Sequence, residues 1–386
     1  MRAPQSHLRF APARLPEETA ELRADLRALL EREHRAGTWE DRGKSWNGHC
    51  PELSRKLGEA GFLGLTFPKQ YGGHERTQLD RYVVTEELLA AGAPTAAHWV
   101  ADRQSGPLIL RFGSDEQKER FVPPIARGES CFCIGMSEPD SGSDLASLAC
   151  RATRVDGGWS LSGTKIWTSN AHFADYCIVC CRTEAKDDGN RHAGLSQVIV
   201  DLKGSTGITV RPILNLGGLH EFNEVVFDDC FVPDDCLLGE PGDGWHQVTS
   251  ELAYERSGPE RFLTNFHVLR ALVGVLSQSD RESTRRLVGS LLSRLWALRQ
   301  ASISVAGMLQ AGELPNVEAS LVKDVGTALQ QELPEIARAV ALDEQIDDVA
   351  FWEVVHHATM LAPAYTIQGG TTEILRGIIA RGLRLR

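Results

Sequence analysis

The order of residue patterns along the chain limits its fold more than any other feature. Leucines recur at spacings of three and four over residues 15–35, and similar helical patterns occupy residues 79–93 and 114–129. Between about 130 and 235 the apolar runs are short, rich in β-branched and aromatic residues, and separated by glycine turns. Helical spacing returns from Gly244 to the end. This order predicts a β-domain between two helical domains, rather than alternating βαβ units.

Turn residues set the expected boundaries. Pro123, Pro124 and Gly128 predict the end of the first helical region, and Asp156-Gly157-Gly158 predicts a hairpin. We therefore expect an N-terminal helical domain over 1–128, a middle β-domain over 129–238 and a C-terminal helical domain over 239–386. Four later prolines are expected to interrupt the C-terminal helices: Pro259, Pro315, Pro334 and Pro363.

Composition and charge exclude several classes of protein. The 386 residues are 42% hydrophobic and 24% charged, which is typical of soluble globular proteins. A net charge of −11 argues against a general attraction to nucleic acid. The N-terminus lacks the apolar core of a secretory signal, and no apolar run reaches the roughly 18–20 residues of a membrane span. A cytoplasmic protein is the default expectation.

The nine cysteines are scattered, and we expect them to serve as reduced core residues. Cys131, Cys133, Cys177 and Cys181 fall in strand-like apolar runs. Cys177 and Cys180 form one C-x-x-C, but no second pair or nearby histidine completes a zinc site. No metal is predicted.

Two stretches of the β-region carry polar groups suited to a ligand. Met136–Ser147 gathers serines, acids and glycines after a strand, which lets the backbone approach a ligand closely. Gly163–Asn170 places Trp167 beside Thr168, Ser169 and Asn170. Taken singly, the first stretch is more often a solvated turn and the tryptophan more often a core residue.

Together the motifs resemble the acyl-CoA dehydrogenase family. The resemblance consists of E-P-x-x-G-S-D from Glu138 and G-x-K-x-W-x-[ST]-N from Gly163, supported by GFLGLTFPKQYGG upstream, Gly242–Trp245 and the terminal GGTTEILRGIIAR. It covers nearly the whole chain. It implies an α+β fold with an N-terminal α-helical domain, a middle β-barrel or sandwich domain and a C-terminal α-helical bundle.

The resemblance also implies an oxidoreductase acting on the CH–CH group of an acyl-CoA thioester. A base would take the proton from the α-carbon, and a hydride would pass from the β-carbon to N5 of FAD. By match to the family motifs, Met136, Ser137, Trp167 and Ser169 would line the flavin, and Ser143 would lie near the CoA arm. Thr371 and Glu373 match positions on the pyrophosphate and adenosine side.

The terminal Gly369-Gly370 pair departs from the commonest form of the family. The residue aligned with Gly369 is usually the catalytic glutamate, and that carboxylate is absent here. A glycine keeps its backbone N–H, which the family uses to stabilise charge on the thioester oxygen. One branch of the family carries its base on the helix after the G-x-G-[FW] turn, and that position corresponds to Glu255. Arg256 matches the arginine that follows this base, and it is expected at the substrate.

Local sequence supports attention to Glu255. Pro259 removes the N–H that would bond the Glu255 carbonyl, and Gly258 loosens the same turn, so the helix is expected to be distorted. Glu251, one turn earlier, would raise the pKa of Glu255 if both were buried. Glu260 is the rival base, but on one ideal helix it points roughly 140° away. The competing interpretation is a solvated Glu-Arg pair on a helix face.

Two family segments are missing from the C-terminal region. The R-x-x-F-G segment, whose arginine reaches the FAD of a neighbouring subunit, and the Q-x-x-G-G-x-G segment are both absent. The chain then anchors FAD by other residues, pairs with a homologous second subunit, or has lost activity.

The family implies an electron-transferring flavoprotein as acceptor and a homo- or hetero-oligomer. A flavin-dependent oxidase or monooxygenase on the same scaffold, and a non-catalytic homologue, are the alternatives from other classes.

Overall fold

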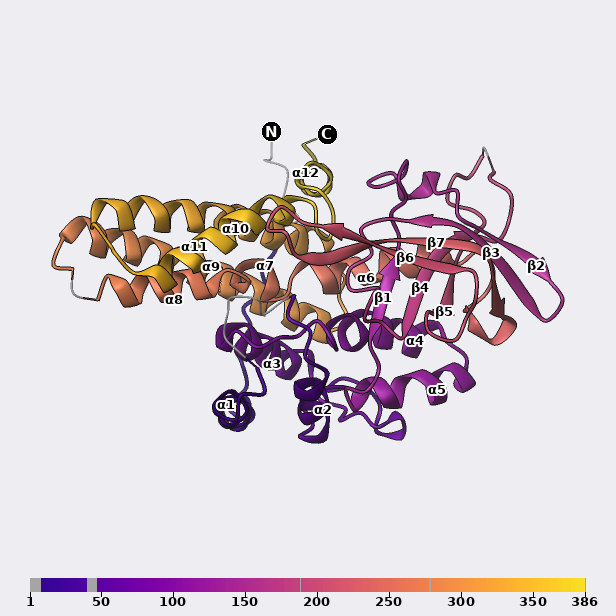
Figure 1. Ribbon diagram of the computed structural model, residues 1–386, viewed down its shortest axis with the longest axis horizontal. Helices are drawn as coiled ribbons and strands as arrows, with labels where there is room; N and C mark the ends of the chain where they lie inside the picture. The colour runs from indigo at the N-terminus through magenta and orange to yellow at the C-terminus, as the bar shows by residue number, and fades with distance from the viewer. Residues whose placement is uncertain (1–7, 40–46, 188, 278, 386) are drawn as a thin grey trace, which may run out of the picture. The chain divides into compact units, whose positions relative to one another are not determined.

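Helices and strands follow one another in the predicted order in a computed structural model of the chain (Figure 1). The structure describes residues 8–39, 47–187, 189–277 and 279–385, without the side chains of 251–255. The first helical region contains α1 (Thr19–Arg35), α2 (Pro51–Glu59), η1 (Lys69–Tyr71), α3 (Gln78–Ala91), η2 (Ala101–Ser105), α4 (Gly106–Phe112) and α5 (Asp115–Ala126). The last contains α6 (Gly244–Arg256), α7 (Glu260–Leu263), α8 (Phe266–Val275), α9 (Glu282–Gln310), α10 (Asn316–Asp343), α11 (Val349–Leu361), η5 (Ala362–Thr366) and α12 (Thr372–Gly382).

A single eight-stranded sheet fills the middle of the chain, in the order β6-β7-β3-β2-β4-β5-β8 with β1 paired to β4. Its elements are β1 (Phe132–Gly135), η3 (Leu145–Ser147), β2 (Arg151–Val155), β3 (Gly158–Lys165), β4 (Tyr176–Arg182), β5 (Leu195–Asp201), β6 (Ile208–Leu214), β7 (His220–Pro233), η4 (Asp234–Cys236) and β8 (Leu237–Leu238). The predicted hairpin is confirmed, because Val155 and Gly158 pair across the Asp156-Gly157 turn.

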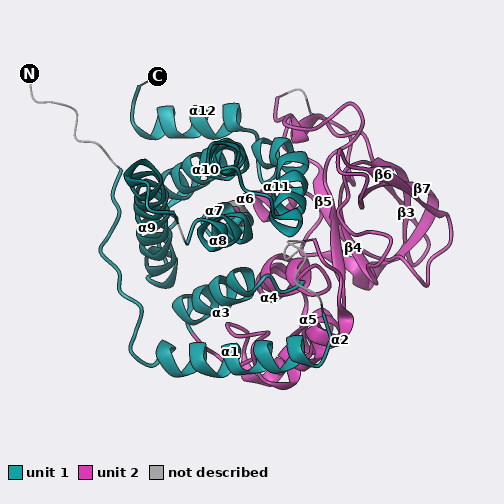
Figure 2. Ribbon diagram, turned by 60° about the vertical axis from the view of Figure 1, so that its left-hand side comes forward, with its two compact units in different colours: residues 1–46, 77–94, 252–386 teal, residues 47–76, 95–251 magenta. Residues whose placement is uncertain are grey.

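The chain divides into two compact units that do not follow sequence order (Figure 2). Unit 1 contains residues 1–46, 77–94 and 252–386, and unit 2 contains residues 47–76 and 95–251. In unit 1, α3 packs on α1, α7 and α9, and α10 packs on its neighbouring helices. In unit 2, α4 and α5 pack together, and the apolar core extends from these helices into the sheet.

The cysteines of the strands lie in this core, as predicted. Cys133, Cys177 and Cys181 are fully buried free thiols. Burial raises the pKa of the Cys180 thiol to about 11, so it stays protonated at neutral pH. These side chains therefore act as small apolar residues of the sheet.

One of the expected proline breaks is wrong, because Pro334 lies inside α10. Pro123 and Pro124 lie in the last turn of α5, which ends at Ala126, close to the end predicted by Gly128. Pro334 is buried, so its packing outweighs the lost backbone hydrogen bond. Pro259 and Pro315 stand at helix starts, where a missing N–H costs little.

A buried ion pair fixes one end of β3. Lys165 is 0% exposed, and its Nζ lies 2.7 Å from Glu138 Oε1 and donates to the Met136 carbonyl at 3.0 Å. Glu138 also accepts from the backbone N–H groups of Ala149 and Cys150. Glu138 thereby joins the two ends of the loop over residues 138–149, and Lys165 joins this loop to the end of β3.

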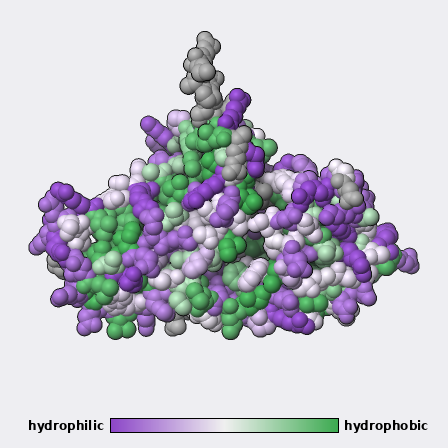
Figure 3. All heavy atoms as spheres, turned by 90° about the horizontal axis from the view of Figure 1, so that it is seen from above, coloured by the Kyte–Doolittle hydropathy of each residue, from purple (hydrophilic) through white to green (hydrophobic). Residues whose placement is uncertain are grey.

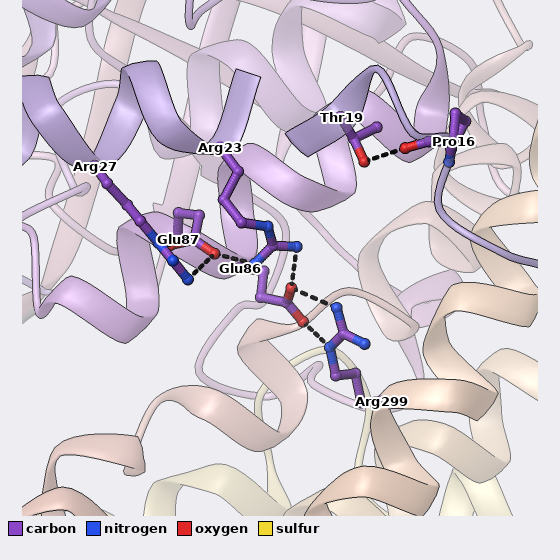
Figure 4. Close-up of polar contacts among 7 residues, drawn as sticks. All are labelled: Pro16, Thr19, Arg23, Arg27, Glu86, Glu87 and Arg299. Carbon is purple, nitrogen blue, oxygen red and sulfur yellow. Dashed lines mark hydrogen bonds and ion pairs between the residues drawn. The ribbon is translucent and has the colours of Figure 1, made fainter. Parts of the chain in front are cut away.

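A second cluster of charges ties α3 to α1 and α9 inside unit 1. Figure 4 shows Arg23 and Arg299 directed at Glu86, and Arg23 and Arg27 directed at Glu87. Arg299 holds Glu86 with two nitrogens, and both carboxylates are buried. Surface residues are mixed in character, with hydrophilic and hydrophobic side chains interspersed on the face drawn in Figure 3.

Among the described residues, none of the helices combines the length and apolar composition needed to cross a bilayer.

Replacement of Glu86 by alanine is expected to lower the free energy of unfolding by about 2–4 kcal/mol, because Arg23 and Arg299 lose a buried partner. Glu31→Ala removes the exposed partner of Arg35 and is the matched control, with an expected cost of about 0.5 kcal/mol or less. Urea denaturation followed by circular dichroism measures both. Equal costs would show that the α3 cluster behaves as a surface pair.

Lys165→Met is expected to cost about 3–5 kcal/mol, because it leaves the Glu138 carboxylate buried without its cation. In the double variant Lys165→Met/Glu138→Gln no charge remains buried there, so part of the loss should return. The same denaturation experiment gives the coupling energy. Additive effects of the two substitutions would contradict a direct interaction.

Candidate active site

The loop after β1 is closed on itself. Glu138 and Ser141 exchange two backbone hydrogen bonds, of 2.8 and 3.1 Å, and the Ser141 hydroxyl donates to the Asp144 carbonyl. Met136 and Ser137 precede this closed turn and are half-buried, whereas Ser143 lies at its exposed side. The loop thus presents Met136 and Ser137 from a fixed backbone, with Ser143 further along.

The turn after β3 is joined to the same loop. The Ile166 N–H donates to the Ser137 carbonyl at 2.9 Å, next to the bond from Lys165 to Met136. Met136, Ser137, Trp167 and Ser169, the four residues predicted to line a flavin, therefore lie on two segments held together by Lys165 and Ile166. Neither Lys165 nor Glu138 was assigned a role from sequence. No clear signal was present in the sequence, because Lys165 ends a strand that also contains serines, a threonine and glycines, and its burial with Glu138 is visible only in the structure.

Trp167 stands out in conformation and in exposure. Its φ is +60°, a region that bulky residues rarely occupy, and its indole is 57% exposed with one edge contact, to Phe222. Such strain persists where surrounding contacts impose it, and it is concentrated at functional sites. The adjacent Thr168 hydroxyl is buried, and no described residue is its hydrogen-bond partner. An exposed flat ring beside an unsatisfied hydroxyl suits a planar ligand with a polar edge.

The helix that carries Glu255 ends where the sequence predicted a distortion. α6 stops at Arg256, and α7 begins at Glu260 after Ser257, Gly258 and Pro259. The Glu255 side chain lies outside the described residues. On α10, Gln330 donates to the Arg261 carbonyl at 2.8 Å, which satisfies a backbone group next to the break.

The break changes the comparison with Glu260. The expected separation of roughly 140° assumed one continuous helix, and that assumption is wrong because α6 and α7 are separate. Glu260 is 4% exposed, and its carboxylate folds back over Gly258, where a Cβ would meet Oε2 at 2.1 Å. The nearest guanidinium nitrogen of Arg261 lies 4.0 Å from this carboxylate. Gly258 is thus needed for packing of the Glu260 side chain.

The terminal turn adopts a backbone that only glycine enters easily. Gly369 has φ +69° and Gly370 has φ +102°. Arg256, which is buried, donates from Nε to the Gly369 carbonyl at 3.1 Å. A Cβ at Gly370 would lie 3.3 Å from Arg256 Nη2. No described residue accepts a hydrogen bond from the Gly369 N–H.

Tyr365 anchors the chain just before this turn. Its hydroxyl donates to Asn265 Oδ1 at 3.0 Å, and Lys323 and Thr327 of α10 donate to its carbonyl at 3.5 and 3.4 Å. Sequence analysis did not identify Tyr365, Asn265 or Lys323. Their roles depend on contacts between helices that are far apart in sequence, so no local pattern could reveal them.

The start of α12 carries the two remaining predicted residues. Thr371 caps the helix, and its hydroxyl accepts from the Ile374 N–H at 3.3 Å. Glu373 is exposed in the first turn. In unit 1 the structure therefore brings Arg256, Gly369, Thr371 and Glu373 to one turn and the helix that follows it.

Comparison with known proteins identifies the family of the chain. The chain matches the family models for the acyl-CoA dehydrogenase N-terminal domain over residues 16–129, middle domain over 133–230 and C-terminal domain over 242–384. It is 34% identical over 362 residues to acyl-CoA dehydrogenase IpdE1 of Mycobacterium tuberculosis, a match that covers 90% of this chain and 88% of the relative.

Solved structures give the same result. The "Tcur3481-Tcur3483 steroid ACAD" superposes with a TM-score of 0.84 at 28% identity, covering 97% of this chain and 98% of the other. The "ChsE4-ChsE5 complex from Mycobacterium tuberculosis" superposes with a TM-score of 0.82 at 27% identity, covering 98% and 99%. With the helical, sheet and helical regions in the order of the three family models, the chain belongs to the acyl-CoA dehydrogenase family of oxidoreductases.

Proposed function

We propose that the chain catalyses α,β-dehydrogenation of an acyl-CoA thioester, with Glu255 as the base and the Gly369 N–H as the donor to the thioester oxygen. The observation that carries this proposal is the Gly369-Gly370 turn, held by Arg256 on one side and Tyr365 on the other. A fixed N–H without an acceptor among the described residues is the kind of group that stabilises a developing oxyanion.

Arg256 has a positioning role in this scheme. Its Nε donates to the Gly369 carbonyl and so fixes the peptide between Gly369 and Gly370. Without this bond the two glycines could adopt many other backbone conformations. The same arginine directly follows Glu255 and closes α6, so one residue links the base-bearing helix end to the oxyanion turn. This role is added to the substrate contact that the family resemblance implies for Arg256, and the two are compatible because a guanidinium has five N–H donors.

The residues of unit 2 fit the family's cofactor. Met136, Ser137, Trp167 and Ser169 lie on the two linked segments, and the exposed indole of Trp167 and the unpaired Thr168 hydroxyl suit an isoalloxazine ring. Thr371 and Glu373 are proposed for the pyrophosphate and adenosine side, at the N-terminal turn of α12. When bound there, FAD would supply the acceptor for the hydride from the β-carbon. Ser143 is proposed for the CoA arm.

The missing R-x-x-F-G segment favours a partner subunit. Both solved structures described above carry two protein names in their titles, and one title states a steroid substrate class. These likenesses support a hetero-oligomer and a bulky acyl group for this chain. Electron-transferring flavoprotein as acceptor, a cytoplasmic location and the domains 1–128, 129–238 and 239–386 stay predictions from sequence.

Trp167→Gly tests the cofactor site. Glycine adopts φ +60° without strain, so the free energy of unfolding should stay unchanged or rise by up to about 1 kcal/mol. Flavin content, read from absorbance near 450 nm per chain, should fall because the ring contact is lost. Trp296→Gly, an exposed tryptophan of α9, is the control and should keep the flavin. An unchanged flavin content in Trp167→Gly would remove Trp167 from the site.

Glu255→Gln tests the base. We expect the variant to purify yellow, with the partner chain if one is required, and to lose acyl-CoA-dependent flavin bleaching by about 10²–10⁴-fold. Glu260→Gln is the matched comparison, because Glu260 is the rival carboxylate beyond the break, and it should bleach nearly as the unmodified protein does. Bleaching lost in Glu260→Gln and kept in Glu255→Gln would transfer the role to Glu260.

A further inference from the structure

The Trp167 turn is a bulge in the pairing of β3 with β7. Lys165 pairs with Val225, but beyond it Thr168 exchanges backbone hydrogen bonds with Asn223, and the Asn170 N–H donates to the Glu221 carbonyl. The register therefore shifts by one residue, and the extra residue on the β3 side is accommodated at Ile166 and Trp167. A glycine normally takes the left-handed position of such a bulge, so a tryptophan there needs contacts that impose the conformation.

Asn223 supplies these contacts. It is 0% exposed, and its side-chain Nδ2 donates to the Thr168 carbonyl at 2.9 Å. A carbonyl only accepts, so this bond fixes which end of the amide is nitrogen. The second Nδ2 hydrogen faces His172 Nδ1 at 3.1 Å, and Oδ1 faces His220 Nε2 at 2.7 Å. His220 must therefore donate from Nε2, and His172 must accept at Nδ1.

The two histidines stack on each other. Their ring centroids are 3.7 Å apart with planes at 18°, and the stack continues from His172 to Phe173 and from Phe173 to His49. A proton on His172 Nδ1 would direct an N–H at the Asn223 amide nitrogen, which has no lone pair to accept it. The added charge would also face the stacked ring of His220. Only a neutral His172 is compatible with the observed bonds.

We propose that Asn223, His172 and His220 form a clamp that holds the Trp167 bulge in place and releases it when His172 is protonated. Asn223 is a positioning residue here, since it acts through the Thr168 backbone. The clamp itself is a property of the described chain. Its consequence for the cofactor rests on the proposed function, which assigns Trp167 to the flavin.

The charged groups around the clamp set the direction of its pH dependence. Phe173 lies between the rings of His49 and His172. Lys203 and Asp175 lie near His49. Glu221 is next to His220 on β7. Burial and then His220 lower the pKa of His172 from 6.5 to about 4. A released imidazole regains its ordinary pKa, so between pH 6.5 and 4 the released state binds a proton that the clamped state does not. The clamp is therefore stable above pH 6.5 and weakens as pH falls.

Hydrogen exchange read by mass spectrometry tests the clamp on the purified protein. The reporters are the N–H groups of Thr168, Asn170 and Asn223, in peptides covering 166–173 and 220–225. After correction for intrinsic rates, opening of these amides should increase about tenfold from pH 7.5 to 5.5. His172→Phe keeps a stacked ring but takes up no proton, so its opening should be the same at both pH values. The control His246→Phe, at an exposed histidine of α6, should keep the tenfold change.

The variant Asn223→Asp gives a second test, whose expected result does not depend on pH. A carboxylate oxygen would face the Thr168 carbonyl, so the reporters should be unprotected even at pH 7.5. Equal opening of the unmodified protein at both pH values, or a tenfold change retained in His172→Phe, would overturn the clamp. Flavin content measured on the same samples separates the two proposals. If the protein binds flavin but its opening does not depend on pH, the clamp proposal is wrong and the cofactor site stands. If opening depends on pH but the protein never binds flavin, the cofactor site is wrong and the clamp stands.

Discussion

The buried pair of Lys165 and Glu138 is the interaction on which the geometry of the Met136 loop and the Trp167 turn depends. An ammonium group in the core needs compensation, and Lys165 obtains it from one carboxylate and the Met136 carbonyl. Because both partners come from the loop after β1 and Lys165 ends β3, the same contacts that stabilise the charge also fix the loop against the turn at Trp167. The contacts that compensate the charge of Lys165 are therefore the same contacts that position the loop and the turn.

A comparable principle operates in unit 1 with different chemistry. The terminal turn carries no carboxylate at Gly369 or Gly370, and it is built from these two glycines with positive φ. Its rigidity comes from outside, through Arg256 on the Gly369 carbonyl and α10 on the Tyr365 carbonyl. In the proposed mechanism this turn acts through its backbone alone, and it can do so because neighbouring residues hold the peptide in place.

Sequence reasoning succeeded where structure is set locally. Leucine spacing predicted α1, the helical pattern from residue 114 predicted α5, and the Asp156-Gly157 turn predicted the hairpin, because each depends on residues within a few positions. It failed where distant contacts decide the outcome. Pro334 continues α10 because the helix is buried, and the bulge at Trp167 exists because Asn223 on another strand imposes it. The family motifs named candidate site residues, and these assignments stay predictions, whereas the residues that hold their backbone, such as Lys165 and Tyr365, came only from the structure.

The discontinuous make-up of the two units constrains how the chain folds during synthesis. The polypeptide passes from one unit to the other at 46/47, 76/77, 94/95 and 251/252. The helices α1 and α3 are made early, but Glu86 of α3 receives Arg299 of α9 only after another two hundred residues have left the ribosome. Until then Leu79 and Tyr82 of α3 lack Ile303 and Ala306 of α9, against which they pack, so this part of the core is completed only late in synthesis.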